Sequence, residues 1–168
     1  MKLYKFYQIF LIVLYAAMIA FFCYQCLKDG TSSSQASDNV AKTIAEVQTT
    51  ITQKPVVVDD SYKISIRKLV GHFGYFMLMG GVSILLWLSI KNIKPKPIIL
   101  IPHYILGCGF ALFSEFVLEK NTSGRGASII DVGIDSLGFV SLSTFVFVIY
   151  LIVYLVKRKK KNDIREEI

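Results

Sequence analysis

Four long apolar runs constrain the fold of this 168-residue chain more than any other feature of its sequence. Each run approaches or exceeds the roughly 20 residues that a helix needs to cross a bilayer core of about 30 Å. The runs extend from Phe6 to Leu27, from Leu69 to Ile90, from Ile98 to Leu118 and from Ile129 to Val156. They use most of a chain that is 54% hydrophobic, which leaves no room for a separate soluble domain. The sequence therefore predicts an all-α fold, an integral membrane four-helix bundle formed by residues 1–168 as a single domain.

The first run has a second interpretation, because Lys2 and Lys5 followed by apolar residues are also typical of a secretory signal peptide. The run is longer than the usual apolar region of such a peptide, and no small-x-small cleavage site follows it. In addition, Phe22 stands directly before Cys23, where a lipoprotein signal has a small residue. We therefore expect the first run to be retained as a membrane span.

Basic residues outside the runs predict the orientation, because lysine and arginine stay on the cytoplasmic side of a membrane. They gather in three segments, which contain Lys2 and Lys5, then Lys91, Lys94 and Lys96, and finally the stretch KRKKK at residues 157–161. We predict that both termini are cytoplasmic, with outer loops at residues 28–68 and 119–128 and a cytoplasmic tail at 157–168. The net charge of +7 comes largely from these segments, which favours anionic lipid headgroups over nucleic acid as the partner.

The first outer loop contains one helical pattern. Residues 30–39, GTSSSQASDN, have the composition of a linker. Apolar residues then recur at 40, 44, 47 and 51, which places them on one side of a short amphipathic helix. Ser37 or Asp38 can cap this helix, and Pro55 ends it. We expect it to lie against the bilayer surface or the bundle, with a partner-binding helix as the alternative, and we interpret residues 56–60 and 63–68 as extended.

Motifs for cofactor chemistry are missing from the sequence. Cys23 and Cys26 have the spacing of a redox pair, but on a membrane helix cysteines are more often small apolar residues, and Cys108 leaves an odd number. We find no Walker motif, zinc-binding spacing or Gly-x-Ser-x-Gly elbow. The sequence therefore predicts no disulfide, no metal site and no cofactor.

Ionisable residues gather at one depth, the outer ends of the last three runs, when depth is counted at about 1.5 Å per helical residue. His72 and Glu115 each lie about one turn inside a run, and Asp131 and Asp135 begin the last one. Basic residues flank these ends. The candidate polar site consists of Lys68, His72, Glu115, Arg125, Asp131 and Asp135.

Such residues require partners, because an ionisable side chain within a span costs about 3 kcal/mol and normally faces the bundle interior. Asp131 and Asp135 share one helix face, where they repel each other unless a cation lies between them. Arg125 is the nearest candidate cation in the sequence, and a protonated His72 is the second.

Simpler explanations exist for each residue. The sequence SIID, from Ser128 to Asp131, is a capping box, in which an acid is favoured by the helix dipole. Asp135 can lie solvated at the headgroup level, and Glu115 can extend outward from its last turn. His72 can be a structural histidine, and we expect no function for His103, which has no polar neighbour in the sequence.

Three stretches carry a resemblance to a known family. They are RKLVGHFGYFMLMG at residues 67–80, SEF at 114–116 and GRGASIIDVGIDSLG at 124–138. Together they resemble the VanZ-like family of bacterial membrane proteins over about residues 67–138. The matching residues are Lys68, His72, Phe73, Glu115, Arg125, Asp131, Asp135 and Gly138. The chain departs from the family pattern at two places. After Glu115, Leu118 or Glu119 stands where family members usually have a glutamine. The stretch HFGYF lacks the acidic residue that the family often has between the histidine and the tyrosine.

The resemblance implies a protein of the bacterial plasma membrane, and the namesake of the family is associated with low-level resistance to the glycopeptide teicoplanin. It implies an outer-leaflet polar site that binds or modulates a cell-envelope component, either an envelope lipid or a glycopeptide-related ligand. Two other hypotheses stay open. One is an intramembrane enzyme acting on a lipid-linked or phospholipid substrate, in which Arg125 holds a phosphate and His72 or Glu115 moves a proton. The other is a structural protein in which the charges only join helix ends.

Overall fold

The structure is a computed structural model that describes residues 2–90 and 95–166. This part of the chain is built from helices and loops and contains no strand. The α-helices are α1 (Lys2–Cys26), α2 (Gly30–Thr52), α3 (Asp60–Ile66), α4 (Tyr75–Leu88), α5 (Leu100–Phe113) and α6 (Ile129–Glu166). Two π-helical segments, η1 (Arg67–Gly74) and η3 (Ser114–Leu118), continue α3 into α4 and extend α5. Two 3₁₀ turns, η2 (Pro97–Ile99) and η4 (Glu119–Asn121), flank the α5 span.

Four helical segments are long and apolar enough to cross a membrane. They are Tyr4–Cys26, Asp60–Leu88, Pro97–Asn121 and Ile129–Lys160. Each overlaps one of the four runs expected from the sequence, so the prediction of an all-α multi-pass membrane protein is confirmed. The second span starts earlier than predicted, because α3, η1 and α4 form one continuous helix.

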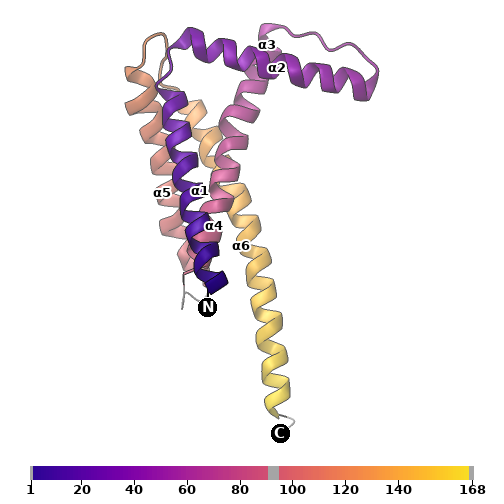
Figure 1. Cartoon of the computed structure of the whole chain (residues 1–168), viewed down its shortest axis with the longest axis vertical. Helices are drawn as coiled ribbons and strands as arrows, with labels where there is room; N and C mark the ends of the chain where they lie inside the picture. The colour runs from indigo at the N-terminus through magenta and orange to yellow at the C-terminus, as the bar shows by residue number, and fades with distance from the viewer. Residues whose placement is uncertain (1, 91–94, 167–168) are drawn as a thin grey trace.

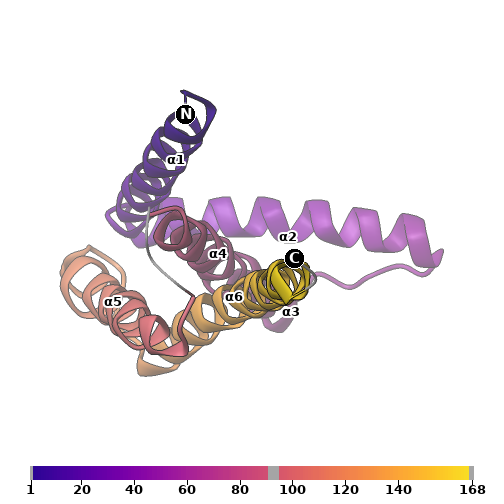
Figure 2. The same cartoon turned by 90° about the horizontal axis from the view of Figure 1, so that it is seen from below.

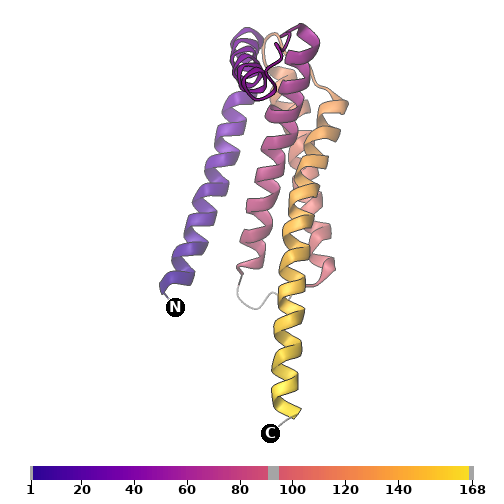
Figure 3. The same ribbon diagram turned by 90° about the vertical axis from the view of Figure 1, so that its right-hand side faces the viewer.

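The four spans run side by side, and α2 lies across one end of them (Figure 1). We call this end the α2 end; it is formed by α2, α3 and residues 119–128. The first turn of α1 and the last turn of α6 lie at the opposite end. Seen along the bundle, α4 lies between α1 and α6, and α5 packs against α6 (Figure 2). The last turns of α6 extend beyond the other spans (Figure 3).

The predicted linker at residues 30–39 is wrong, because α2 already begins at Gly30. Asp29 caps it by accepting a hydrogen bond from the backbone N–H of Ser32 at 2.9 Å, which satisfies one of the free donors of the first turn. Hydrogen bonds from the Thr31 hydroxyl and from Ser32 hold the pKa of Asp29 well below its usual range. Thus α2 is a 23-residue helix rather than a short one, and Ser37 and Asp38 lie inside it.

The extended interpretation of residues 63–68 is also wrong, because they belong to α3 and η1. Asp59 caps α3 through the backbone N–H of Tyr62, at 2.7 Å. Lys63 then reaches Asp38 of α2, with 3.6 Å between Nζ and Oδ2. This ion pair helps to hold α2 against the start of the second span.

The basic segments at the opposite end are only partly described. Lys91 and Lys94 lie outside the described residues. The predicted tail beginning at Lys157 continues α6 as a helix up to Glu166. At about 1.5 Å per residue, a helix of 38 residues is about 57 Å long, well beyond the roughly 30 Å of a bilayer core.

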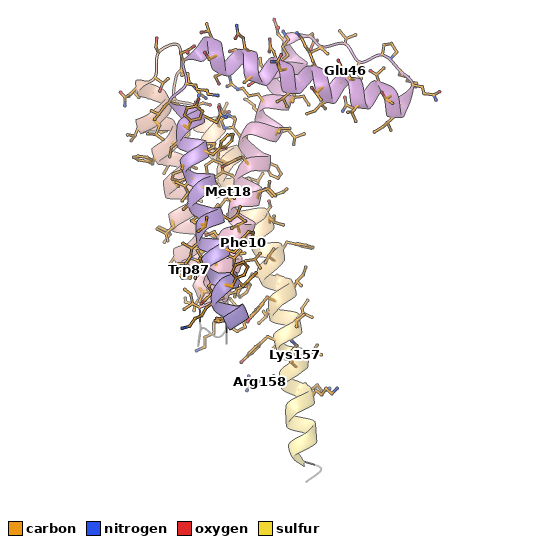
Figure 4. The ribbon with its side chains drawn as sticks, viewed as in Figure 1. Phe10, Met18, Glu46, Trp87, Lys157 and Arg158 are labelled. Carbon is orange, nitrogen blue, oxygen red and sulfur yellow. The ribbon has the colours of Figure 1, made fainter. Side chains whose placement is uncertain are left out.

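Apolar side chains fill the bundle and also cover its outside. The larger core cluster contains Phe22, Cys26, Phe76, Met79, Ala111, Val132 and Phe139, and the smaller one contains Ile84, Leu88 and Phe147. On the outer faces, Phe10 (Figure 4), Ile105 and Phe145 are 53%, 66% and 61% exposed. Such surfaces are unfavourable in water and favourable in lipid. The exposed faces therefore agree with a membrane environment.

Two glycines allow the second span to approach α6 closely. A Cβ atom at Gly80 would lie 2.2 Å from the carbonyl oxygen of Phe139, and one at Gly138 would lie 2.3 Å from that of Phe73. Only glycine fits at such contacts, which are typical of closely packed membrane helices. Gly138 lies one helical turn after Asp135, so the same contact fixes how far Asp135 is from η1.

We predict that Gly80→Ala lowers the free energy of unfolding by about 1–3 kcal/mol, because the added methyl group forces α4 and α6 apart. The measurement is denaturant or thermal unfolding of the purified protein in detergent. Gly133→Ala is the matched control, since a Cβ atom at Gly133 meets no atom within 4 Å. Equal stability of the two variants would contradict the close packing described here.

Candidate functional site

Three spans bring one buried ionisable side chain each to the α2 end of the bundle. His72 comes from η1, Glu115 from η3 and Asp135 from α6. The Nδ1 atom of His72 lies 3.1 Å from Oδ1 of Asp135 and 4.0 Å from Oε1 of Glu115. All three side chains are buried: His72 is 5% exposed, Glu115 is 1% exposed and Asp135 is 0% exposed. We call this set the His72 cluster; it brings together three of the six residues of the candidate polar site.

Two of the three residues lie on π-helical segments. A π-helical turn holds an extra residue, which shifts the direction of the side chains that follow it; such turns are rare, and they are frequently found at functional sites. The η1 segment carries His72, and the η3 segment carries Glu115. The π-helical segments of the second and third spans are therefore the segments that carry His72 and Glu115, the two side chains beside Asp135.

Glu115 also caps the last span. Its Oε2 atom accepts a hydrogen bond from the backbone N–H of Ser128 at 3.0 Å, directly before α6 begins. The Ser128 hydroxyl accepts in turn from the backbone N–H of Asp131 at 3.2 Å. In a complete capping box, the acid three residues after the serine would bind the serine N–H. Here Glu115 takes that place, so the predicted capping box is half present.

The carboxylate of Asp131 is therefore free to face the second span. Its oxygens lie 3.9 Å from Nη2 of Arg67 and 3.7 Å from Nζ of Lys68. The prediction that Lys68 and Asp131 belong to one site is supported by this pairing. Of the two candidate cations for Asp131 and Asp135, His72 lies beside Asp135, whereas Arg125 pairs with Glu119.

Arg125 instead joins the second loop to the first span. Its Nη2 atom donates to Oε1 of Glu119 at 2.6 Å, and its Nη1 atom donates to the carbonyl oxygen of Gln25 at 2.8 Å. A longer contact of 3.5 Å reaches the carbonyl of Cys26. These carbonyls belong to the last turn of α1, where they have no partner within the helix. Arg125 thus neutralises the buried Glu119 and also donates hydrogen bonds to carbonyl groups at the end of α1.

The simpler explanations for two of the acids are excluded by burial. Asp135 is 0% exposed, so it does not lie solvated at the surface, and Glu115 is 1% exposed, so it does not extend outward. His72 has Asp135 and Glu115 as acidic partners, which fits both a structural histidine and a functional one. His103, for which we expected no function, has its Nδ1 atom 3.5 Å from the Ser83 hydroxyl.

The charges of the cluster are only partly balanced. Asp131 has two basic neighbours and Glu119 has Arg125. Among the described residues, His72 is the only ion-pair partner of Glu115 and of Asp135. In addition, Oδ2 of Asp135 and Oδ1 of Asp131 are buried without a hydrogen-bond partner. Two buried carboxylates therefore share a single histidine, an arrangement that favours a proton or a cation between them.

A pocket of about 290 Å³ lies beside the cluster, between α1, α2 and η1. Its apolar lining includes Phe21, Phe22, Val40, Ile66, Val70 and Tyr75. Its polar lining includes Arg67, His72, Glu119 and Arg125. His72 belongs both to this lining and to the buried cluster. It therefore connects the pocket to Glu115 and Asp135.

Two residues of the site, Arg67 and Glu119, were not among the predicted site residues. Each has a sequence signal that could have indicated it. Arg67 directly precedes Lys68, and Glu119 follows Glu115 by four residues, a helical spacing that places two acids on the same side. The three cysteines are free thiols.

Comparisons with protein-family models, with curated proteins and with solved structures gave no match to this chain. The site is therefore interpreted from its own geometry.

We predict that Arg125→Gln lowers the free energy of unfolding by about 3 kcal/mol, because it leaves the buried Glu119 without a counter-charge. The double variant Arg125→Gln/Glu119→Gln should recover part of this loss, since it removes both charges. Unfolding in detergent is measured for the unchanged protein, for Arg125→Gln, for Glu119→Gln and for the double variant. Lys120→Gln, at an exposed neighbouring position, is the control. Losses that simply add in the double variant would contradict the pairing.

Proposed function

We propose that this protein binds an anionic, lipid-linked component of the bacterial cell envelope in the outer leaflet of the plasma membrane, and that binding lowers susceptibility to glycopeptides such as teicoplanin. The observation that carries the proposal is the pocket at the α2 end, which combines apolar walls with two arginines, Arg67 and Arg125. A ligand with an apolar chain and a phosphate or diphosphate head matches both parts.

The two parts of the pocket have different requirements. The aromatic and aliphatic walls from α1 and η1 favour a hydrocarbon chain, because its transfer from water is favourable. Guanidinium groups recognise phosphate through paired, charge-assisted hydrogen bonds. Arg67 is the better candidate for direct contact, since its side chain is 41% exposed and its nearest acidic partner, Asp131, is 3.9 Å from Nη2. Arg125 is already bound to Glu119.

The distribution of basic residues supports an outer location for the pocket. Lys157 and Arg158 lie on α6 at the end opposite α2 (Figure 4). Because such residues stay in the cytoplasm, this end is assigned to the inside and the α2 end to the outside. Both termini are then cytoplasmic. An outer pocket meets lipid-linked wall precursors and glycopeptides on the side of the membrane where both are exposed.

The resemblance to the VanZ-like family supports the glycopeptide part of the proposal. The residues that match the family pattern include His72, Glu115 and Asp135, which form the buried cluster, and Arg125, which lines the pocket. Gly138, another matching residue, is required for the close contact of α6 with η1. The pattern residues therefore belong to one connected site rather than to separate parts of the fold.

We predict that Arg67→Gln weakens binding of a polyprenyl-diphosphate wall precursor by about tenfold, the loss expected for one charge-assisted contact. Binding is measured with the full-length protein in nanodiscs, against nanodiscs of phosphatidylcholine alone. The fold should persist, because Lys68 still pairs with Asp131. Lys42→Gln, an exposed change on α2 outside the pocket, should bind like the unchanged protein. Unaltered affinity of Arg67→Gln would contradict the proposed ligand site.

The same variants test the effect on antibiotic susceptibility. Expression of the unchanged protein in a glycopeptide-sensitive Gram-positive host should raise the minimum inhibitory concentration of teicoplanin, and Lys42→Gln should do the same. Arg67→Gln should return it to the level of the empty vector at equal membrane abundance. If Arg67→Gln raised the minimum inhibitory concentration as much as the unchanged protein does, resistance would not depend on the pocket, and this part of the proposal would be contradicted.

A second candidate function is an intramembrane enzyme acting on a lipid-linked or phospholipid substrate. It is favoured by the hydrogen bond between His72 and Asp135, because a carboxylate that orients a histidine beside a substrate pocket is a recurring arrangement for proton transfer. Incubation of the purified protein with envelope lipids, followed by mass spectrometry, tests it. The enzyme hypothesis predicts a new product that His72→Gln abolishes. Binding without any product, across pH and added metals, supports the binding function alone.

A further inference from the structure

We propose that His72, Glu115 and Asp135 bind a divalent transition-metal cation. One ligand atom from each residue, the Nδ1 or Nε2 of the histidine and one oxygen of each carboxylate, lies within 4.8 Å of the other two. The three residues come from η1, η3 and α6, so a bound cation would join three of the four spans at one point. The proposal does not depend on the lipid-linked ligand of the pocket.

Charge balance is the first reason for a cation. The two other buried acids of this end have basic partners: Asp131 has Arg67 and Lys68, and Glu119 has Arg125. Glu115 and Asp135 have only His72 among the described residues. A divalent cation with a neutral histidine and two carboxylates has no net charge, which is the state that a buried site favours.

An unsatisfied oxygen is the second and independent reason. Oδ2 of Asp135 belongs to a side chain that is 0% exposed, and it has no hydrogen-bond partner. Leaving a charged acceptor buried and unpaired costs several kcal/mol in general terms. Coordination supplies a partner for this carboxylate. Glu115 is already oriented by the backbone N–H of Ser128 at 3.0 Å, as metal-binding carboxylates usually are by a neighbouring donor.

The distances allow coordination after small side-chain movements. Nitrogen and oxygen ligands lie about 2.0–2.2 Å from a zinc ion, which places them about 3–4 Å from one another. Nδ1 of His72 is 3.1 Å from the nearer oxygen of Asp135 and 4.0 Å from that of Glu115. One imidazole nitrogen with two carboxylate oxygens suits Zn²⁺ or Mn²⁺ better than a soft cation such as Cu⁺.

A cation can reach the His72 cluster through the pocket between α1, α2 and η1. His72 is one of the pocket-lining residues, so an ion can enter at the histidine side of the cluster. Three protein ligands leave at least one coordination position open, as in metal sites that also bind water or a ligand.

Metal content of the full-length protein tests the proposal. The protein is purified in detergent, stripped with a chelator, and dialysed against Mn²⁺ or Zn²⁺, after which bound metal is counted by inductively coupled plasma mass spectrometry. We expect about one ion per chain, and a rise of the unfolding temperature on metal addition. His72→Gln, Glu115→Gln and Asp135→Asn should each weaken Mn²⁺ binding by at least about tenfold.

Two matched variants serve as controls. His103→Asn removes a buried histidine that lies 12 residues before Glu115 and close to Ser83, and Glu46→Gln removes an exposed acid on α2 (Figure 4). Both should bind metal like the unchanged protein. A variant that fails to fold is recognised by its gel-filtration profile, and Asp135→Asn is then replaced by Asp135→Ser. Absence of bound metal, or undiminished binding in folded His72 and Asp135 variants, would overturn the proposal and leave the lipid-binding function untouched.

Discussion

The contact between His72 and Asp135 is the interaction on which the α2 end of this protein depends. An acid with no exposed surface, in the first turns of a membrane span, is stable only when another helix brings a partner to it. His72 provides that partner from the second span at 3.1 Å. The third span adds Glu115, which approaches the same histidine. Three spans are therefore held at one depth by polar contacts rather than by apolar packing alone.

The rest of this end follows from that contact. Gly138 and Gly80 allow the second span to lie close to α6, which keeps η1 within reach of Asp135. Glu115 satisfies the N–H of Ser128 and so frees Asp131 to pair with Arg67 and Lys68. Arg125 connects this arrangement to α1 through the carbonyl of Gln25. The first span, which has few buried residues of its own, is tied to the others by this arginine at the α2 end.

Much of this arrangement could be predicted from the sequence. Apolar length is a direct consequence of bilayer thickness, so the four spans were found to within a few residues at most ends. The common depth of His72, Glu115 and Asp135 followed from counting residues along each span. Both predictions rest on one-dimensional information, because helical rise converts sequence position into depth.

The pairings could not be predicted in the same way, because they depend on how each span is rotated. The π-helical turns of η1 and η3 change that rotation, and nothing in the helical spacing of RKLVGHFG indicates them. Arg125 is close to Asp131 in sequence, yet the loop directs it to Glu119 and α1. The linker composition of residues 30–39 was likewise overridden, because the cap at Asp29 and the burial of Ala41 and Ala45 stabilise α2 as a helix.

A double-variant cycle between His72 and Asp135 tests most directly whether these spans share one buried polar cluster. The unfolding free energies of His72→Gln, Asp135→Asn and the combined variant are measured in detergent, with a chelator present. Each single change should cost about 3 kcal/mol. The combined change should cost at least about 1 kcal/mol less than their sum, because the second residue loses nothing further once its partner is gone. Costs that add to within about 0.5 kcal/mol would show that the two side chains do not interact.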